Sequence, residues 1–253
     1  MLGLGNSLIK AQSIPFINLY SLDFDGTDDW LVVANQANFK FNYNTAFSVS
    51  AWIKTSASAD QGIFGKTLTG SPWTGYSCFL NTAGKIYFQM ISQTTAPYKI
   101  DLITTSVTAN DGNWHHLVWT KTTATAASGV TIYKDTTAYT TSSGLTINTN
   151  GDTLGDNSTL TDREPLIGAN DDRPGLPFNG NIDEVAVFTK ALSASEISTL
   201  YGGGTPQTAG NANGVGRILG YWKIEEGSGT TVVDSSTNSN TGTFNSAPAW
   251  AAH

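Results

Sequence analysis

The chain has 253 residues, of which 39% are hydrophobic and 11% aromatic, so it can bury a full core and lies within the range of one large all-β domain. Only 13% of the residues are charged, and the formal net charge is −7. Lysine and arginine do not cluster, which argues against a nucleic-acid backbone or an anionic membrane as a partner.

Residues 1–20 open the chain without a basic segment or a continuous apolar stretch. This composition is typical of neither a signal peptide nor a membrane span, so we expect the mature protein to start at Met1. The apolar residues of this segment fit neither a strand period nor a helix period. We therefore interpret residues 1–20 as an attachment arm rather than as part of the core.

Alternating segments bounded by turn residues follow as far as residue 188. In FSVSAWIKT, one face carries the expected core positions Phe47, Val49, Ala51 and Ile53. This spacing predicts an antiparallel all-β fold. The Asp-Gly pair in NDGNWHHLVWT predicts a tight hairpin before the next strand. Cys78 is the only cysteine, so no internal disulfide can form, and we expect a buried structural thiol.

One helix is predicted in ALSASEISTLYGGG. Ser193 can cap the first free backbone amides while Glu196 reaches back to it, and Leu192 can pack onto Ile197. The glycines that begin at Gly202 then end the helix. The segment after them, residues 202–217, is rich in Gly, Asn and Thr and is expected to be a flexible linker.

Five segments carry a family resemblance: SLDFDGTDDWLVV, FSVSAWIKT, DGNWHHLVWTK, VTIYKD and GNIDEVAVFTKALSASEISTLY. Their order and spacing resemble those of the laminin-G-like group of concanavalin A-like lectin/glucanase folds. The resemblance covers residues 21–201 and is most specific in IDEVAVF and ALSASEI. It implies a single antiparallel β-sandwich jelly roll with one short helix.

The segment GYWKIEEGSGTTVVDSSTNSNTGTF resembles the first strand and following loop of the same family, although it lies near the end of this chain. The chain therefore resembles a circularly permuted member. Residues 218–253 are too few to bury a core of their own. A linker of about 15 residues spans about 20 Å, which is enough to bring Tyr221–Ile224 back onto the sandwich. We expect a strand from this segment to complete the same sandwich, or a neighbouring subunit's by exchange.

The opening MLGLGNSL, together with the late tail, also resembles proteins of marine tailed phages. This likeness implies a component of the virion surface, in the capsid or the tail, with residues 1–20 bound to another virion protein. The lack of signal-peptide features and of disulfides agrees with that setting. A homo-oligomer is compatible with it.

Glucan hydrolases that share this fold use two carboxylates from alternate positions of one strand, typically in a Glu-x-Asp-x-x-Glu run. No such run occurs here, and the adjacent side chains of Asp183 and Glu184 are expected to point to opposite faces of a strand. His115 and His116 lack partners at metal-ligand spacing and are interpreted as structural. His253 is given no role. We therefore expect a protein without enzymatic activity.

The resemblance implies a structural calcium ion. Asp25 and Asp183 match the family's positions best, with Asp29 next, and calcium binds hard oxygen ligands of this kind. In the alternative interpretation, Asp25 forms an Asx turn with Gly26, and Asp183 binds loop amides.

Exposed aromatic rings would be the mark of a sugar site. Trp73 and Tyr76 in GSPWTGYS, and Tyr98 in TTAPYK, lie in turn-rich segments that can present such rings to a glycan. Alternatively, the three rings cover the edge of the sandwich. The favoured function is a virion-displayed lectin-like module that binds surface glycans, as a tail-fibre head or capsid appendage. A purely structural decoration protein is the alternative, and a glucan hydrolase is least favoured.

Overall fold

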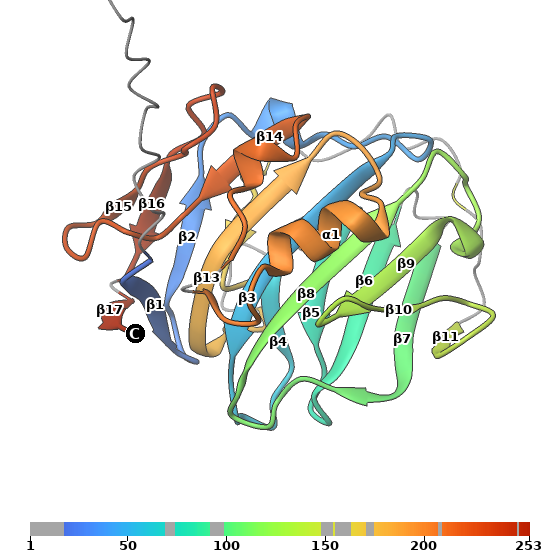
Figure 1. Cartoon of the computed structure of the whole chain (residues 1–253), viewed down its shortest axis with the longest axis horizontal. Coiled ribbons are helices and arrows are strands. Elements are labelled where there is room, and N and C mark those ends of the chain that lie inside the picture. Colours follow the sequence, from blue (N-terminus) through green and yellow to red (C-terminus); the bar gives the residue numbers. More distant parts are fainter. Residues whose placement is uncertain are drawn as a thin grey trace, which may run out of the picture.

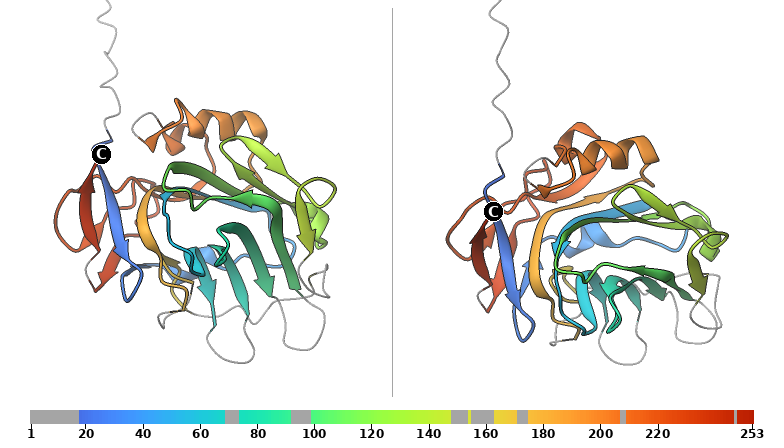
Figure 2. Two further views of the ribbon diagram at one scale, coloured as in Figure 1. Left: turned by 90° about the horizontal axis from the view of Figure 1, so that it is seen from below. Right: turned by 60° about the horizontal axis from the view of Figure 1, so that its bottom comes forward.

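The computed structural model describes residues 18–68, 74–91, 99–147, 154, 163–170, 175–206, 209–246 and 248–253. These residues form two antiparallel β-sheets packed face to face, with one α-helix on the outside of one sheet (Figures 1 and 2). The predicted all-β sandwich with one short helix is confirmed. Within the same residues, no helix has the length and apolar character needed to cross a bilayer.

The sheet next to the helix, sheet A, has eight strands in the order β10-β9-β8-β3-β13-β1-β17, with β14 paired to β13 as well. Its strands are β1 (Tyr20–Asp25), β3 (Phe47–Lys54), β8 (Trp114–Lys121), β9 (Val130–Lys134), β10 (Thr137–Tyr139), β13 (Asn179–Phe188), β14 (Ile218–Trp222) and β17 (Ala249–Ala252). The first half of β13 pairs with β1 and its second half with β14, so these two strands follow each other along the same side of β13.

The opposite sheet, sheet B, has nine strands in the order β11-β7-β6-β5-β4-β12-β2-β16-β15. Its strands are β2 (Trp30–Val33), β4 (Gln61–Thr67), β5 (Gly75–Leu80), β6 (Lys85–Ile91), β7 (Lys99–Thr108), β11 (Leu145–Ile147), β12 (Leu166–Ile167), β15 (Thr231–Val232) and β16 (Gly242–Asn245). Short 3-10 helices occupy η1 (Gln36–Phe39), η2 (Ala127–Gly129) and η4 (Ala212–Gly214).

The core lies between the two sheets and follows the period-two pattern of the strands. The four predicted core positions of β3, at residues 47, 49, 51 and 53, are at most 1% exposed. Cys78 is buried as a free thiol, and burial raises its pKa well above the usual range. Such a thiol is held in its neutral form and serves as a small apolar side chain.

The C-terminal segment belongs to both sheets. In sheet A, β14 pairs with β13 and β17 pairs with β1, while β16 pairs with β2 in sheet B. Trp222, Ile224 and Val232 of this segment are fully buried in the main core. The end of the chain therefore lies beside β1, as the views in Figure 2 also show. The permuted order of elements relative to the family stays a prediction.

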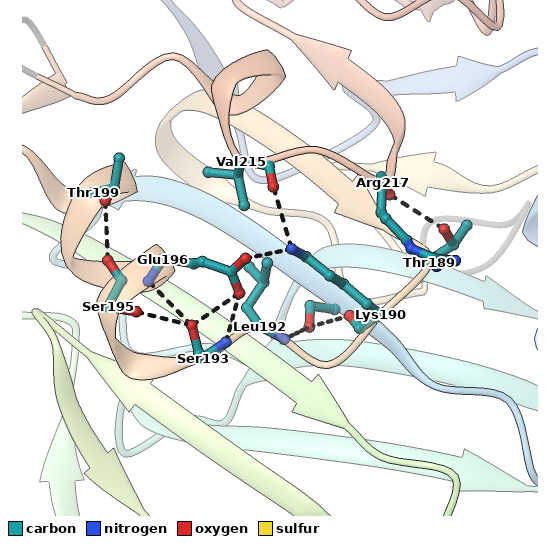
Figure 3. A network of polar contacts seen from close by, with 10 residues as sticks. Thr189, Lys190, Leu192, Ser193, Ser195, Glu196, Thr199, Val215 and Arg217 are labelled. Carbon is teal, nitrogen blue, oxygen red and sulfur yellow. Dashed lines mark hydrogen bonds and ion pairs between the residues drawn. The ribbon is translucent and has the colours of Figure 1, made fainter.

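The helix α1 (Ala194–Tyr201) begins with the predicted capping box. The backbone amide of Glu196 donates to Ser193 Oγ at 3.4 Å, and its carboxylate accepts from the Ser193 amide at 2.9 Å (Figure 3). Ile197 and Leu200 then pack with Val118 on the outer face of sheet A. The predicted helix and its start are confirmed, because capping depends on residues only three positions apart.

Residues 209–217 lie against α1 and sheet A. Ala209 and Ala212 are buried, and the Gly210 amide donates to the Leu200 carbonyl at 2.9 Å. Lys190, which forms an ion pair with Glu196, also donates to the Val215 carbonyl at 3.2 Å (Figure 3). The expectation of a flexible linker does not fit these contacts.

The predicted hairpin at Asp111 and Gly112 is wrong. The turn itself forms: the Asn113 amide donates to Asp111 Oδ1 at 2.9 Å, and Gly112 has a positive φ of 81°. However, β7 before the turn belongs to sheet B and β8 after it to sheet A. Turn chemistry reverses the chain locally, but it does not choose the strand that pairs with the next one.

Candidate functional site

A row of polar side chains crosses the outer face of sheet A. The register places Asp23 opposite Asn181, Asn181 opposite Lys54, and Lys54 opposite Trp114. Neighbouring strands lie about 4.8 Å apart, so the row extends about 14 Å over four strands. We call these four residues the Asp23–Trp114 row.

The row points away from the core because strand residues alternate between faces. The strand neighbours of three row members are fully buried between the sheets: Leu22 beside Asp23, Ile53 beside Lys54 and Ile182 beside Asn181. Asp23 and Lys54 are exposed, whereas Asn181 and Trp114 are partly buried. The helix α1 covers the other end of this face, where it packs on Val118 and Ala186 (Figure 1).

The row lies in a surface depression, and the last strand supplies one wall. Its other lining residues are Ser21, Ala251, Ala252 and His253. The His253 ring lies 5.4 Å from the Trp114 ring, and its side chain is only 5% exposed. In the part of the chain that the structure describes, the side chains of Asp23 and Lys54 have no hydrogen-bond or ion-pair partner. Their charged groups are thus available to a ligand.

Two carboxylates meet at a β-bulge in β13, beside the row. Asn18 Nδ2 donates to Asp183 Oδ2 at 2.9 Å and to Glu184 Oε1 at 3.3 Å. Glu184 has a positive φ of 49°, and the pairing with β3 shifts between Asp183 and Ala186. The expectation that these neighbours point to opposite faces is wrong, because a bulge interrupts the alternation of a regular strand.

This carboxylate pair is closed off from solvent and joins distant segments. Asp183 is fully buried and lies 3.0 Å from His253 Nε2, while Glu184 is 5% exposed and accepts from the Tyr221 hydroxyl. Burial raises the pKa of both carboxyls well above the usual range, and the Asp183 charge raises that of Glu184 further. Glu184 borders a cavity of about 10 Å³, which suits one water molecule rather than a sugar.

The two neighbouring histidines make contacts within the fold. His115 lies between two carboxylates, with Nδ1 2.7 Å from Asp135 Oδ2 and Nε2 3.0 Å from Asp111 Oδ1. Burial disfavours its charged form, but these hydrogen bonds outweigh burial and raise its pKa. His116 Nε2 lies 2.8 Å from Ser50 Oγ, and burial lowers the His116 pKa to about 4. His116 is therefore neutral at neutral pH.

The expected pair of calcium ligands does not come together. Asp25 lies opposite Asn179, and Asp183 is four residues further along β13, or about 13 Å away. The expectation that Asp25 and Asp183 flank one ion is therefore wrong. Asp183 is instead occupied by the buried contacts described above.

Asp25, the last residue of β1, lies with Asp28 and Asp29 of the following loop, and one oxygen from each comes within 4.8 Å of the others. The Thr27 amide donates to Asp25 Oδ1 at 2.7 Å, which is the Asx turn of the alternative interpretation. Three carboxylates form a donor set that suits calcium. Of the three predicted calcium ligands, Asp25 and Asp29 belong to this group, whereas Asp28 was not predicted, and calcium binding itself stays a prediction.

The structure also changes the set of candidate aromatic residues. Tyr76 is fully buried in β5, where its hydroxyl donates to the Phe39 carbonyl at 3.1 Å, so its predicted role in glycan binding is wrong. Trp73 and Tyr98 lie outside the described residues. Trp114 was missed because its significance depends on strand pairing; the alternation in FSVSAWIKT indicated only that Lys54 faces outward.

Comparison with known proteins assigns the chain to a structural family. A family model described as the concanavalin A-like lectin/glucanases superfamily matches residues 25–198, which is more than half of the chain. A search of curated proteins gives no match. Among solved structures, a Bacteroides ovatus protein to which carbohydrate binding is ascribed has a TM-score of 0.57 and 16% identity, covering 93% of this chain and 62% of that one. The chain thus spans less than two thirds of that protein.

Two further structures show weaker likeness. The native heptameric SAP-like pentraxin from Limulus polyphemus has a TM-score of 0.46 and 15% identity, covering 78% of this chain and 88% of that one. Domains LG4-5 of the mouse laminin α1 chain have a TM-score of 0.44 and 14% identity, covering 77% of this chain and 48% of that one. On the family match, the chain belongs to the concanavalin A-like lectin/glucanase superfamily.

Proposed function

We propose that this protein is a non-enzymatic, lectin-like module that binds a glycan along the Asp23–Trp114 row. The observation that supports this most is the row itself. It combines an aromatic ring, an amide and two charged groups in one depression. Aromatic rings stack on the apolar faces of sugars, and polar groups alongside them bind hydroxyls.

The Asp23–Trp114 row is suited to binding because its residues are held in place before a ligand arrives. The four row members stand on four adjacent strands, and their neighbours Leu22, Ile53 and Ile182 are fully buried. Groups held on paired strands lose little freedom when a ligand arrives, which favours affinity. The buried carboxylates of Asp183 and Glu184, in contrast, have no space for a sugar, and this favours binding over hydrolysis.

A glycan array followed by titration calorimetry with the best ligand tests the proposal. We expect Trp114→Ala to weaken binding about tenfold, as the loss of one aromatic stacking contact would. Tyr87→Ala is the matched control, because Tyr87 is a partly exposed strand aromatic on sheet B. Absence of binding to any glycan, or loss of binding in the Tyr87 variant alone, overturns the proposal.

The same ligands test the absence of enzymatic activity. We expect no release of reducing ends after long incubation with the bound oligosaccharides. If the highly purified wild-type protein releases reducing ends and the Glu184→Gln variant does not, a hydrolase is favoured instead.

For its setting, we propose display on a virion surface, with residues 1–17 of the expected 1–20 segment as the attachment arm, because Asn18 is buried and Tyr20 begins β1. The support is the resemblance of MLGLGNSL and of the late tail to phage proteins. Particles assembled with a chain that lacks residues 1–17 should then contain none of this protein. Incorporation of the truncated chain at the normal level would overturn this role of the arm. If the full chain is incorporated but binds no glycan, the structural decoration protein is favoured.

A further inference from the structure

We infer that the Asp23–Trp114 row takes a saccharide with a free amino group, whose ammonium lies at Asp23 while a neighbouring ring stacks on Trp114. This inference rests on the proposed function and adds the class of ligand. It also gives the ligand a direction, because the two end groups of the row differ in chemistry and lie three strands apart.

Asp23 is the group that would receive the ammonium. Its carboxylate is exposed on the outer face of β1 and has no partner among the described residues. On one side it is paired with Ala249, whose small side chain leaves the carboxylate accessible, and on the other with Asn181. Asn181 offers both an amide donor and an acceptor to the sugar that carries the ammonium.

The charge around Asp23 favours a cation over an anion. A second depression shares Asp23 and is also lined by Asp25, Asp28 and Asp29. Among the described residues that line the two depressions, Lys54 is the only lysine or arginine, so acidic groups outnumber it. Burial lowers the pKa of His253, which keeps that ring neutral at neutral pH. A uronic acid would therefore be repelled at the Asp23 end of the row, where the two depressions meet.

Lys54 does not cancel this preference. It lies two strand spacings from Asp23, or about 9.6 Å. The described residues show no ion pair between Lys54 and Asp23, and exposed charges about one Debye length (8–10 Å) apart are partly screened at physiological ionic strength, so Lys54 weakens the attraction of an ammonium to Asp23 without abolishing it. Lys54 pairs directly with Trp114, where it can donate to a hydroxyl or carbonyl oxygen of the stacked ring.

Titration calorimetry with three oligosaccharides of equal length tests the inference: glucosamine oligomers, N-acetylglucosamine oligomers and oligogalacturonate. The assay runs at mildly acidic pH, with calcium and again with chelator, so that a metal effect is seen separately. We expect the glucosamine oligomer to bind about fivefold more tightly than the N-acetylated one, as one exposed ion pair would allow. High salt should reduce this difference.

Asp23→Asn should remove the fivefold difference, so that the glucosamine oligomer and the N-acetylated oligomer bind this variant with similar affinity, because the amide keeps hydrogen-bonding groups at this position but carries no charge. Glu164→Gln is the matched control, because Glu164 is an exposed acid outside both depressions, and it should behave like the wild type. If Trp114→Ala weakens all oligosaccharides while Asp23→Asn changes nothing, the inference is wrong and the proposed function stands. Binding of none of these oligomers or of any array glycan overturns both. Polylysine serves as a cation that is not a sugar. If it binds as tightly as the glucosamine oligomer, and binds Trp114→Ala as tightly as the wild type, the assignment to an amino sugar is wrong.

Discussion

The imidazole ring of His253 packs against the indole of Trp114, with the ring centroids 5.4 Å apart. The His253 ring is fixed from behind, because its Nε2 lies 3.0 Å from Asp183 Oδ2 and 3.0 Å from the Tyr20 carbonyl. A buried carboxylate thus holds a ring that borders the aromatic end of the row. We infer that His253 is a positioning residue for Trp114.

The first prediction follows from that contact. His253→Ala should weaken glycan binding about threefold, in line with the loss of one aromatic pair contact. His253→Phe keeps a ring beside Trp114 and should restore most of the affinity. Calorimetry on both variants measures this.

A double-mutant cycle serves as the control for that prediction. In a Trp114→Phe background, the effect of His253→Ala on affinity should shrink, because coupled residues are not additive. If the two effects simply add, His253 does not act through Trp114.

The second prediction concerns pH and the buried Glu184. Its folded pKa is raised by burial and by Asp183, so between the unfolded and the folded pKa the folded state binds more protons than the unfolded state. Stability therefore falls as pH rises through this window. Glu184→Gln removes the buried charge but keeps an oxygen that can accept from the Tyr221 hydroxyl.

The variant should accordingly gain stability over the wild type as pH rises above about 4.3, the unfolded value for glutamate. The total gain should be about 1.4 kcal/mol for each unit by which the folded pKa is raised. Urea unfolding across a pH series measures the difference, with Glu164→Gln as an exposed control. A difference between Glu184→Gln and the wild type that stays constant with pH would show that folding does not shift the pKa of Glu184.

The third prediction is that the Asp25–Asp29 loop binds a structural calcium ion. An ion that binds only the folded state adds about 2.7 kcal/mol at a hundredfold excess over Kd. Chelator should then lower the melting temperature of the wild type but leave Asp28→Asn nearly unchanged. If chelator has no effect and elemental analysis finds no calcium, the Asx turn at Asp25 is sufficient to explain the loop.

The fourth prediction concerns the C-terminal segment. Deleting residues 205–253 removes β14, β16 and β17 and leaves the edges of β1 and β2 unpaired. Exposed strand edges pair with other chains, so the truncated protein should aggregate. Light scattering measures this, and a soluble truncation with an unchanged melting temperature would show that the segment is dispensable.

A point variant separates packing from edge exposure in the same segment. Trp222 is fully buried and packs beside Phe39 and Phe64, so Trp222→Ala should cost about 3–5 kcal/mol. Trp250→Ala, at a partly exposed position of β17, should cost less. Equal losses in the two variants would contradict the burial seen here.

The sequence alone determined the features that depend on close neighbours. Alternation assigned Phe47 and Ile53 to the core, because successive residues of a strand face opposite ways. The capping box of Ser193 and Glu196 was predictable because its partners lie three residues apart. The family and its fold class were also recognisable from motifs in their order along the chain.

Only the tertiary structure decided which distant residues meet. Asp23, Lys54 and Trp114 form one row because of strand register, which no local pattern specifies across four strands. The bulge at Asp183 and Glu184 reversed the expectation drawn from a regular strand. His253 had no motif of its own, and its contacts with Asp183 and Trp114 exist because β17 returns to pair with β1. Such contacts are set by the packing of the whole sandwich, so short segments of the sequence carry too little information to place them.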